Sequence, residues 1–476
     1  MGVWVVQRRS RTVTQRRRHT IVVAVLTSVV VMSNAVLGVT PARAERPLID
    51  PAQLPEPSIP APLEATEQKN ACALPSETAD LQEVPTALEA LDFASVWPIT
   101  RGAGQLVAVI DTGVTPHPRL PGLTPGGDYV GTGDGLVDCD AHGTMVAGLI
   151  AAQTAPGSGF AGGAPDARIL SIRQSSNAFQ IVDIRPEEEK AAEPENAAGY
   201  GNVRTMAMAI RTAVDSGATV INISEVACVP AGAGVADGPL GAAVQYAVRE
   251  RNVVVVAAAG NLGGAACLAQ NPRTDPLRPD ADPWNGFATI ATPAWFDDVL
   301  TVGSVESDGT PSSFSLAGPW VDVAAPGSNM ISLSPAGNGL ANGVRGNDGV
   351  NPMTGTSFAA PLVAAVAALI RSHRPDLTAL EVVDRIERTA HAPAEGWNPL
   401  VGHGVVDPLA AVTDLLVPSP PTVPADSVAM RAPVSPPAPD HGPRDTAVTG
   451  SVLVAVILAV GLALSIPVRR RSRTER

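Results

Sequence analysis

Three short stretches of the sequence carry a serine, a histidine and an aspartate at positions suited to nucleophilic catalysis. Ser357 stands between Gly355 and an apolar, alanine-rich run, so its hydroxyl is expected at the start of a helix. The N-terminus of a helix offers unpaired N–H groups and the positive end of the helix dipole, and both favour developing negative charge. Taken alone, Ser357 reads better as an ordinary helix cap than as a nucleophile, because serine is common at that position.

Two distant stretches give Ser357 its candidate partners. Residues 106–113 form an apolar run that ends in Asp111 and a glycine, which predicts a buried parallel strand with a carboxylate at its C-terminal edge. His142 opens an apolar helix expected over residues 142–152. A histidine there could accept the proton of Ser357, while Asp111 would hold its ring and stabilise the imidazolium. The pattern predicts acyl transfer from a peptide to water.

The three stretches resemble the Asp, His and Ser signatures of the subtilases and follow in the order of that family. The resemblance implies a catalytic triad of Asp111, His142 and Ser357. A fourth stretch, Ala257–Asn261, resembles the subtilase oxyanion segment and implies that Asn261 is a side-chain donor to the oxyanion. No metal or organic cofactor is expected for this chemistry.

The sequence departs from ordinary subtilisins where substrate should lie. Subtilisins usually read Ser-Leu-Gly at the edge strand that walls the primary pocket, and this chain has Ser224-Glu225-Val226. Valine in place of glycine is expected to crowd the pocket and narrow specificity. Glu225 reads as a solvated edge residue or as a specificity determinant, and we favour the first reading. The substrate-binding residues that the resemblance implies are Ser224, Glu225, Val226, Ala258, Ala259 and Gly260.

Two other protease classes share single motifs with this chain. Aspartic proteases also use Asp-Thr-Gly, but they need a second such turn, and the sequence contains only the one at Asp111. Sedolisins share the Gly-Thr-Ser turn but pair it with a glutamate and an aspartate. The stretch around His142 therefore argues against a sedolisin.

The elements that must position these residues alternate between strands and helices. Such alternation predicts an α/β fold with a parallel sheet covered on both faces. The resemblance to the subtilases implies a subtilisin-like three-layer αβα arrangement with a mostly parallel central sheet. Strands are expected at 106–110, 168–173, 219–223, 253–258, 299–305 and 321–324, and helices at 142–152, 203–216, 238–251, 356–373 and 378–390. A charged insertion at about 174–201 is expected to be a solvated loop.

The N-terminal end predicts export. Residues 1–44 combine an arginine-rich start, an apolar run and an Ala-x-Ala site, which is typical of a signal peptide cut after Ala44. An uncleaved anchor is the alternative. Residues 45–96 are proline-rich and are expected to be an extension that lies along the protease domain at 97–416.

The C-terminal end predicts a membrane anchor. Residues 417–446 form a proline-rich linker, and residues 447–468 contain an uncharged apolar run long enough to cross a hydrocarbon core. The basic tail at 469–476 should remain in the cytoplasm. The protein is therefore expected in the cell membrane as a single-pass protein, with its catalytic domain extracytoplasmic and its C-terminus cytoplasmic.

Charge and cysteine content narrow the environment and the partners. The formal net charge is −13, and the arginine-rich ends mean that the segment between them is more acidic still. Nucleic acid is therefore not expected as a partner. The four cysteines lack metal-binding spacing, and an even number in an exported chain predicts two disulfides, with three possible connectivities.

The whole layout resembles the mycosins, the membrane-anchored subtilases of type VII secretion systems, and Asn222–Cys228 resembles a stretch of theirs. The resemblance implies disulfides Cys72–Cys139 and Cys228–Cys267 and an extension that wraps the domain without acting as an inhibitory propeptide. It implies a serine endopeptidase that processes protein substrates of a type VII secretion membrane complex. The alternative is a mainly structural component of that complex, with proteolysis secondary.

Overall fold

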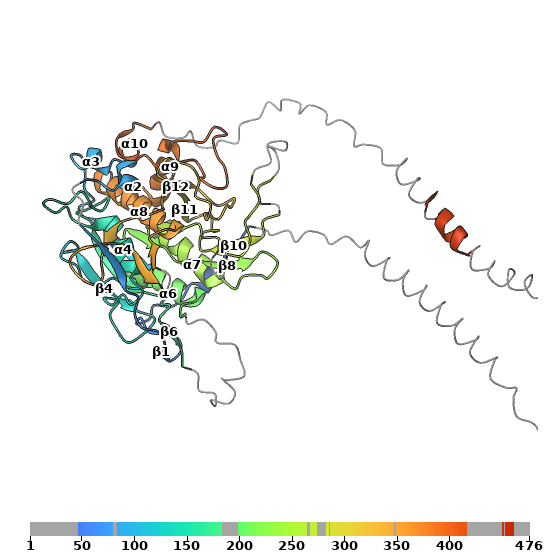
Figure 1. Cartoon of the computed structure of the whole chain (residues 1–476), viewed down its shortest axis with the longest axis horizontal. Coiled ribbons are helices and arrows are strands. Elements are labelled where there is room, and N and C mark those ends of the chain that lie inside the picture. Colours follow the sequence, from blue (N-terminus) through green and yellow to red (C-terminus); the bar gives the residue numbers. More distant parts are fainter. Residues whose placement is uncertain are drawn as a thin grey trace, which may run out of the picture. The chain divides into compact units, whose positions relative to one another are not determined.

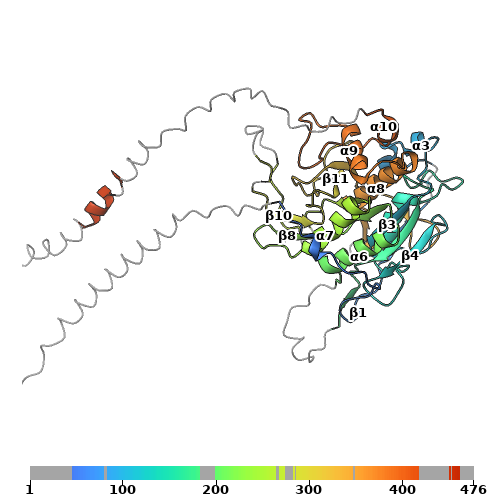
Figure 2. The same ribbon diagram turned by 180° about the vertical axis from the view of Figure 1, so that it is seen from behind.

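The structure is a computed structural model, shown from two sides in Figure 1 and Figure 2. The described residues fall into two compact units, one within residues 1–415 and one within 416–476, and each is described by itself. The described residues are 46–79, 83–182, 199–263, 267–273, 282–284, 286–346, 349–416, 450–451 and 453–460. The predicted signal peptide, the whole predicted linker, the basic tail and positions 183–198 of the predicted insertion lie outside them.

A parallel sheet of seven strands forms the centre of the first unit. In spatial order its strands are β12 (Val323–Pro326), β11 (Leu300–Val305), β9 (Val254–Ala258), β7 (Val220–Ile223), β3 (Leu106–Asp111), β5 (Arg168–Arg173) and β4 (Leu123–Asp128). Every residue of β3, β7, β9 and β11 is buried, as the continuous Val, Ile and Ala runs predict for strands covered on both faces. The predicted α/β fold with a parallel central sheet is confirmed.

Helices cover the sheet in two groups, visible in Figure 2. One group contains α4 (His142–Ala151), α8 (Thr356–His373), α9 (Ala379–Thr389) and α10 (Pro408–Thr413). The other contains α6 (Val203–Asp215), α7 (Gly238–Gln245) and the π-helical turn η2 (Tyr246–Glu250). Within the first group α4 packs on α8, and α8 packs against several strands of the sheet. Helix α8 is therefore the central helix of the core, and it also carries the predicted nucleophile at its start.

Short antiparallel pairs surround the main sheet, and none of them is among the elements expected from the sequence. Strand β8 pairs with β10, and β1 pairs with β6, so the described base of the predicted insertion contains a strand. A further sheet joins β13, β14, β15 and β2. Their bounds are β1 (Thr66–Gln68), β2 (Pro75–Thr78), β6 (Phe179–Ile181), β8 (Ala227–Pro230), β10 (Thr289–Thr292), β13 (Ser332–Leu333), β14 (Leu340–Gly346) and β15 (Gly349–Pro352).

The N-terminal extension is held on the domain through its own short elements. These are η1 (Pro51–Gln53), β1, β2, α2 (Thr86–Glu89) and α3 (Phe93–Val96). The turn η1 packs against α7, β1 and β2 each pair with a strand far along the chain, and α3 contacts α10. The extension therefore touches both helix groups, as an extension lying along the domain should.

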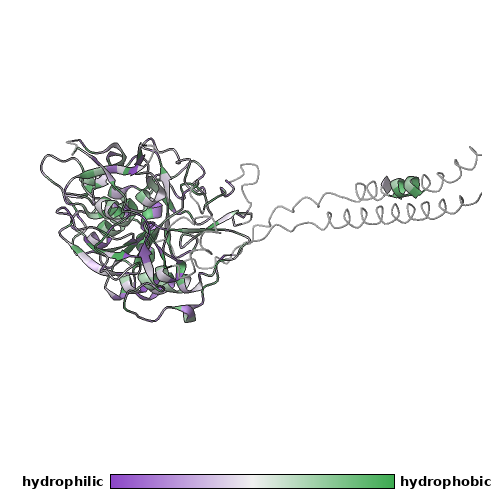
Figure 3. Cartoon of the chain, turned by 60° about the horizontal axis from the view of Figure 1, so that its bottom comes forward, coloured by the Kyte–Doolittle hydropathy of each residue, from purple (hydrophilic) through white to green (hydrophobic). Residues whose placement is uncertain are grey.

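One described helix, α8, is long and apolar enough by composition to cross a membrane, but 89% of its apolar window is buried in the first unit. That burial identifies α8 as a core helix. In the second unit the described residues 450–451 and 453–460 are helical, exposed and largely apolar, as Figure 3 shows. They belong to the predicted span at 447–468, whose other residues lie outside the described ones.

Candidate active site

Asp111 and His142 meet at the carboxyl end of the sheet. Asp111 ends β3 and is fully buried, and His142 begins α4. Oδ1 of Asp111 lies 2.7 Å from Nδ1 of His142 and accepts the backbone N–H of Thr112 at 2.7 Å. Because an ionised carboxylate only accepts hydrogen bonds, the proton of the neutral ring belongs on Nδ1. Nε2 is therefore left as the free base that a serine hydroxyl requires.

The close approach of β3 and α4 depends on a glycine. A Cβ added to Gly143 would lie 2.1 Å from the carbonyl oxygen of Gly113 and 3.1 Å from Oδ1 of Asp111. Any larger residue after His142 would therefore push the helix away from the carboxylate. The residue before the helix, Ala141, adopts φ 63°, a left-handed conformation that turns the chain into the helix.

A buried aspartate, Asp138, supports the Asp111–His142 pair. It accepts hydrogen bonds from Oγ1 of Thr112 at 2.8 Å and from the N–H of Thr144 at 2.8 Å. Oγ1 of Thr112 in turn accepts the N–H of Gly143 at 3.0 Å. Burial raises the pKa of Asp138 to about 6, although the hydrogen bonds from Thr144 and Thr112 lower it. This residue is absent from the predicted site, and an acid four positions before His142 was the available signal.

A second carboxylate faces the histidine. Oε1 of Glu225 lies 3.8 Å from Nδ1 of His142, and the Glu225 side chain is 36% exposed. Burial raises the pKa of Glu225 to about 7, with attraction to His142 acting against this rise and repulsion from Asp111 adding to it. Burial lowers the pKa of His142, but the charge and hydrogen bond of Asp111 and the charge of Glu225 raise it overall. Both acids approach the same ring nitrogen, Nδ1, and both stabilise the protonated form of the ring.

Ser357 occupies the first turn of α8 and is 7% exposed. Pro361, four residues later, has no N–H to donate to the carbonyl of Ser357. The hydroxyl of Ser224 donates to that carbonyl instead, at 2.8 Å. The hydroxyl of Ser224, one of the predicted substrate-binding residues, therefore stabilises the turn at Ser357. In the described part of the chain no hydrogen bond joins Ser357 to His142. Catalytic hydrogen bonds are often long or poorly aligned in sites without substrate.

Asn261 and Ser357 meet across Gly355. A Cβ on Gly355 would lie 3.0 Å from Oγ of Ser357 and 3.2 Å from Nδ2 of Asn261, so a larger residue would crowd both side chains. Oδ1 of Asn261 accepts the N–H of Thr356 at 2.8 Å and its hydroxyl at 3.1 Å. These bonds orient the amide so that its nitrogen is on the serine side. The arrangement suits a donor to an oxyanion formed at Ser357.

The remaining predicted substrate-binding residues lie at the ends of two central strands. Glu225 and Val226 follow β7 and line a cavity of about 340 Å³, to which Met206 and Leu240 also contribute. Ala258 and Ala259 are fully buried at the end of β9. Gly260 adopts φ 109° and donates its N–H to Oγ1 of Thr356 at 3.1 Å. This hydrogen bond connects the end of β9 to the turn before Ser357.

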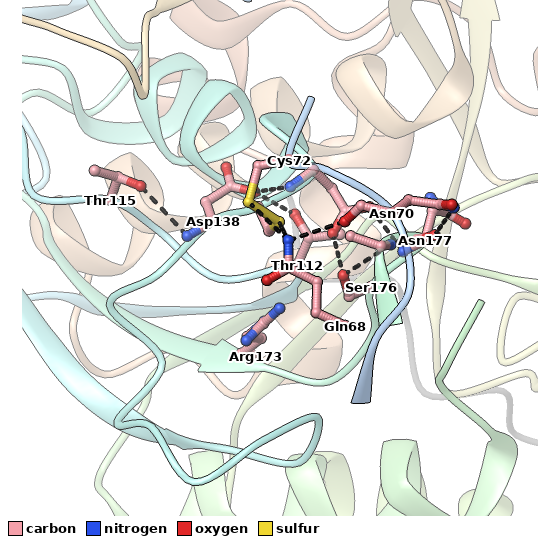
Figure 4. The surroundings of a disulfide bond; sticks show 12 residues. Gln68, Asn70, Cys72, Thr112, Thr115, Asp138, Arg173, Ser176 and Asn177 are labelled. Carbon is pink, nitrogen blue, oxygen red and sulfur yellow. Dashed lines mark hydrogen bonds between the residues drawn. A yellow bond between two sulfur atoms is a disulfide. The ribbon is translucent and has the colours of Figure 1, made fainter. Parts of the chain in front are cut away.

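The two disulfides lie beside these segments. Cys72 is joined to Cys139 and Cys228 to Cys267, the two pairs that the mycosin resemblance implies. The first pair links the extension to the loop before His142, where Nε2 of Gln68 lies 3.6 and 3.7 Å from the two sulfur atoms (Figure 4). The second pair packs near Gly260, whose added Cβ would lie 3.4 and 3.5 Å from its sulfurs.

The fold and this site define the class of the protein. The family model described as Subtilase family matches residues 102–404, and the chain belongs to that family, among its mycosins. Mycosin-4 of Mycobacterium tuberculosis strain H37Rv is 49% identical over 429 residues, which cover 88% of this chain and 90% of mycosin-4. Mycosin-1 of the same organism is 44% identical over 442 residues, covering 92% and 96% of the two chains.

Solved structures give the same answer. A crystal structure of MycP1 from the ESX-1 type VII secretion system matches with a TM-score of 0.72 and 41% identity, covering 79% of this chain and 98% of that one. A chain of an intact ESX-5 inner membrane complex matches with a TM-score of 0.73 and 42% identity, covering 88% and 99%. The expected family and fold are confirmed.

Proposed function

We propose that the chain is a serine endopeptidase whose catalytic residues are Asp111, His142 and Ser357, with Asn261 as oxyanion donor. Family membership supports the serine protease class. The observation that carries the residue assignment is the 2.7 Å bond between His142 and the buried carboxylate of Asp111, in the domain where Asn261 and Ser357 flank Gly355. This combination of a base, a carboxylate and an amide donor beside one hydroxyl supports acyl transfer through a serine nucleophile.

In the proposed acylation step, Oγ of Ser357 attacks the peptide carbonyl carbon. Its proton passes to Nε2 of His142, and Asp111 stabilises the resulting imidazolium. Negative charge develops on the former carbonyl oxygen, where Nδ2 of Asn261 and the backbone N–H of Ser357 stabilise it. The position of Ser357 at the start of α8 adds the positive end of the helix dipole.

The intermediate then collapses. The peptide C–N bond breaks, and His142 donates its proton to the leaving amine, which departs. Water enters, gives a proton to His142 and attacks the acyl carbon, and the second intermediate releases the free acid and regenerates Ser357. One water is consumed for each peptide bond cleaved, and Ser357 and His142 end the cycle in their starting protonation states.

Replacement of the nucleophile tests this assignment. Ser357→Ala should reduce peptide hydrolysis by at least about 10³-fold, because the covalent route is lost. Ser372→Ala, near the other end of α8, is the matched control and should retain wild-type kcat/KM. Thermal unfolding of both variants should stay close to wild type. Wild-type turnover by Ser357→Ala would remove Ser357 from the mechanism.

We further propose that specificity is narrow and that the domain acts outside the cytoplasmic membrane, anchored through residues 447–468. Val226 lines the cavity beside the strand end where substrate should lie, so it limits the side chain that can enter. Two disulfides support an oxidising, extracytoplasmic environment. The exposed apolar helix at 450–451 and 453–460 supports the anchor.

A second role, as a structural part of a type VII secretion membrane complex, is favoured by one specific observation. The similar chain with 42% identity is part of an intact ESX-5 inner membrane complex, and our chain covers 99% of it. Tethering near such a complex would raise the effective concentration of substrate and of neighbouring subunits alike. Catalysis and assembly can therefore coexist in one domain.

The two roles are separable in a strain that lacks this gene. Ser357→Ala should stop substrate processing yet restore secretion, because its surface and anchor are intact. Removal of residues 418–476 should release an active protease that does not restore secretion. Secreted-protein output from each strain is the measurement. Secretion restored by the released protease but not by Ser357→Ala would leave the enzyme role alone and exclude the structural one.

A further inference from the structure

Three potential metal ligands converge at the triad. Nδ1 of His142 lies 2.7 Å from Oδ1 of Asp111 and 3.8 Å from Oε1 of Glu225. One ligand atom from each of the three residues lies within 4.8 Å of the other two. In a hydrogen-bonded triad the histidine needs only one carboxylate partner, which here is Asp111. The second carboxylate is what turns an Asp–His pair into a set with one nitrogen and two oxygen donors.

The buried carboxylate of Asp111 also has a free oxygen. The residue is fully buried, yet its Oδ2 has no hydrogen-bond partner among the described residues. Buried polar atoms nearly always have a partner, because an unsatisfied one retains its full desolvation cost. This orphaned oxygen belongs to one of the three converging side chains, and a cation bound by both carboxylate oxygens of Asp111 would satisfy it.

The donor set and its spacing suit zinc. Zn²⁺ accepts imidazole nitrogen and carboxylate oxygen at about 2.0–2.2 Å, so two ligands on a tetrahedral ion lie roughly 3.3–3.6 Å apart. The observed separations of 2.7 and 3.8 Å lie on either side of that value. Metal binding would therefore require Nδ1 of His142 and Oδ1 of Asp111 to move slightly apart and the partly exposed Glu225 carboxylate to move closer. Of the three ligand residues, Glu225 also lines the cavity of about 340 Å³.

We propose that Asp111, His142 and Glu225 bind a divalent transition-metal cation such as Zn²⁺, and that this binding reversibly inhibits the protease. The inhibitory part rests on the proposed function, whereas the binding part does not. On binding, the metal takes the lone pair of Nδ1, and the ring proton moves through solvent from Nδ1 to Nε2, so the ring stays neutral. Asp111 can then no longer hold the tautomer that leaves Nε2 free to accept the proton of Ser357. No metal is expected from the sequence, because Glu225 is 83 residues from His142 and nothing in the spacing joins them.

Binding is tested without using activity. The Ser357→Ala chain is titrated with ZnCl₂ by calorimetry, together with Ser357→Ala carrying Glu225→Gln or Glu250→Gln. Glu250 is an exposed carboxylate at the end of η2 and serves as the matched control. We expect one Zn²⁺ site that weakens at least tenfold with Glu225→Gln and is unchanged with Glu250→Gln. MgCl₂ should not bind there, since Mg²⁺ prefers octahedral oxygen ligands. Equal zinc affinity with and without Glu225→Gln, or no zinc binding at all, would overturn the proposal.

Inhibition is tested on the wild-type chain with a cleaved peptide. Micromolar ZnCl₂ should lower kcat/KM, a chelator should restore it, and Glu225→Gln should require at least tenfold more zinc. A chain that binds zinc through Glu225 but never hydrolyses peptides would refute the proposed protease function and leave the site intact. A chain that hydrolyses peptides equally well with and without zinc would refute the inhibitory site and leave the protease intact.

Discussion

The two ends of the Asn261 amide do different work. Its oxygen accepts two hydrogen bonds from Thr356 and so holds the turn before Ser357, while its nitrogen lies on the serine side of Gly355. A loss of the side chain would therefore remove the proposed oxyanion donor and also loosen the serine turn. The oxyanion role can be isolated only by a substitution that keeps the acceptor.

Asn261→Asp makes that separation. Aspartate keeps an oxygen for Thr356 but cannot donate to an oxyanion, so we expect turnover to fall by about 10²–10³-fold or more. Unfolding free energy should stay near wild type, whereas Asn261→Ala should lose both activity and about 1–3 kcal/mol of stability. Kinetics on one peptide and chemical unfolding of each variant supply the check. A loss below about threefold in either variant would mean that another group is the donor.

At this scale the sequence indicates the reacting groups but not their supports. Asp111, His142, Ser357 and Asn261 stand in recognisable local contexts, so each can be named from the residues around it. The hydrogen bond from Ser224 to the Ser357 carbonyl cannot be predicted from local sequence, because it joins residues 133 positions apart. The approach of Glu225 to His142 is likewise a product of the tertiary fold, which places the end of β7 beside the start of α4.

Among the helices and strands, too, local sequence predicts some elements, whereas others depend on tertiary contacts. Long apolar runs predicted the buried strands β3, β5, β7, β9 and β11 and helices α6 and α8 to within about a residue at each end. Strand β4 was missed because Leu-Thr-Pro-Gly-Gly-Asp has no apolar run. It lies at the edge of the sheet, where proline is tolerated. The short antiparallel strands depend on distant partners, so their local sequence says little. Helix α7 also ends earlier than predicted, at Gln245, and continues as η2.

Helix α9 carries an acid whose burial makes stability depend on pH. Burial and repulsion from Asp384 raise the pKa of Glu387 to about 7. The pKa of the nearby Asp322 is also raised, by burial and by repulsion from Glu387. An acid with a raised folded-state pKa binds more protons folded than unfolded, so its contribution to stability is lost as pH rises from about 4.5 to 7. The ionised form is therefore the destabilising one.

Glu387→Gln should remove this effect while keeping the shape of the side chain. We expect little change in unfolding free energy at pH 4.5 and a gain of about 1–3 kcal/mol at pH 8. Glu250→Gln, at an exposed position, is the control and should change neither value. Urea unfolding at the two pH values measures the difference. A gain of equal size at both pH values would mean that charge is not the cause.

For the whole molecule, the two disulfides differ more in what they attach than in how much they should stabilise. Cys72–Cys139 spans 67 residues and joins the extension to the loop before His142, whereas Cys228–Cys267 spans 39 residues within the protease domain. Chain-entropy reasoning gives about 4 kcal/mol for either bond, because the dependence on loop length is logarithmic. A measurement of unfolding free energy therefore cannot distinguish the role of the Cys72–Cys139 bond from that of the Cys228–Cys267 bond. A measurement of how firmly the extension is attached to the domain can.

The extension has several other contacts that should survive loss of that bond. The pairing of β2 with β14 and of β1 with β6, and the hydrogen bond from the Ala73 N–H to the Cys139 carbonyl at 2.8 Å, do not require the sulfur atoms. The bond thus converts a set of breakable contacts into a permanent attachment beside His142. Its removal should loosen the extension locally before the domain unfolds.

We therefore predict different outcomes for the two double variants. Cys72→Ala/Cys139→Ala and Cys228→Ala/Cys267→Ala should each lose up to about 4 kcal/mol of unfolding free energy. Under native conditions only the first should become sensitive to limited proteolysis within residues 46–79, and only in the first should kcat/KM fall through disorder of the loop that positions His142. In the second, the effect should centre on Gly260 and the oxyanion segment. Mass mapping of early cleavage products, with peptide kinetics on the same samples, distinguishes them. Equal protease resistance of the extension in both variants would show that strand pairing, and not the Cys72–Cys139 bond, holds it in place.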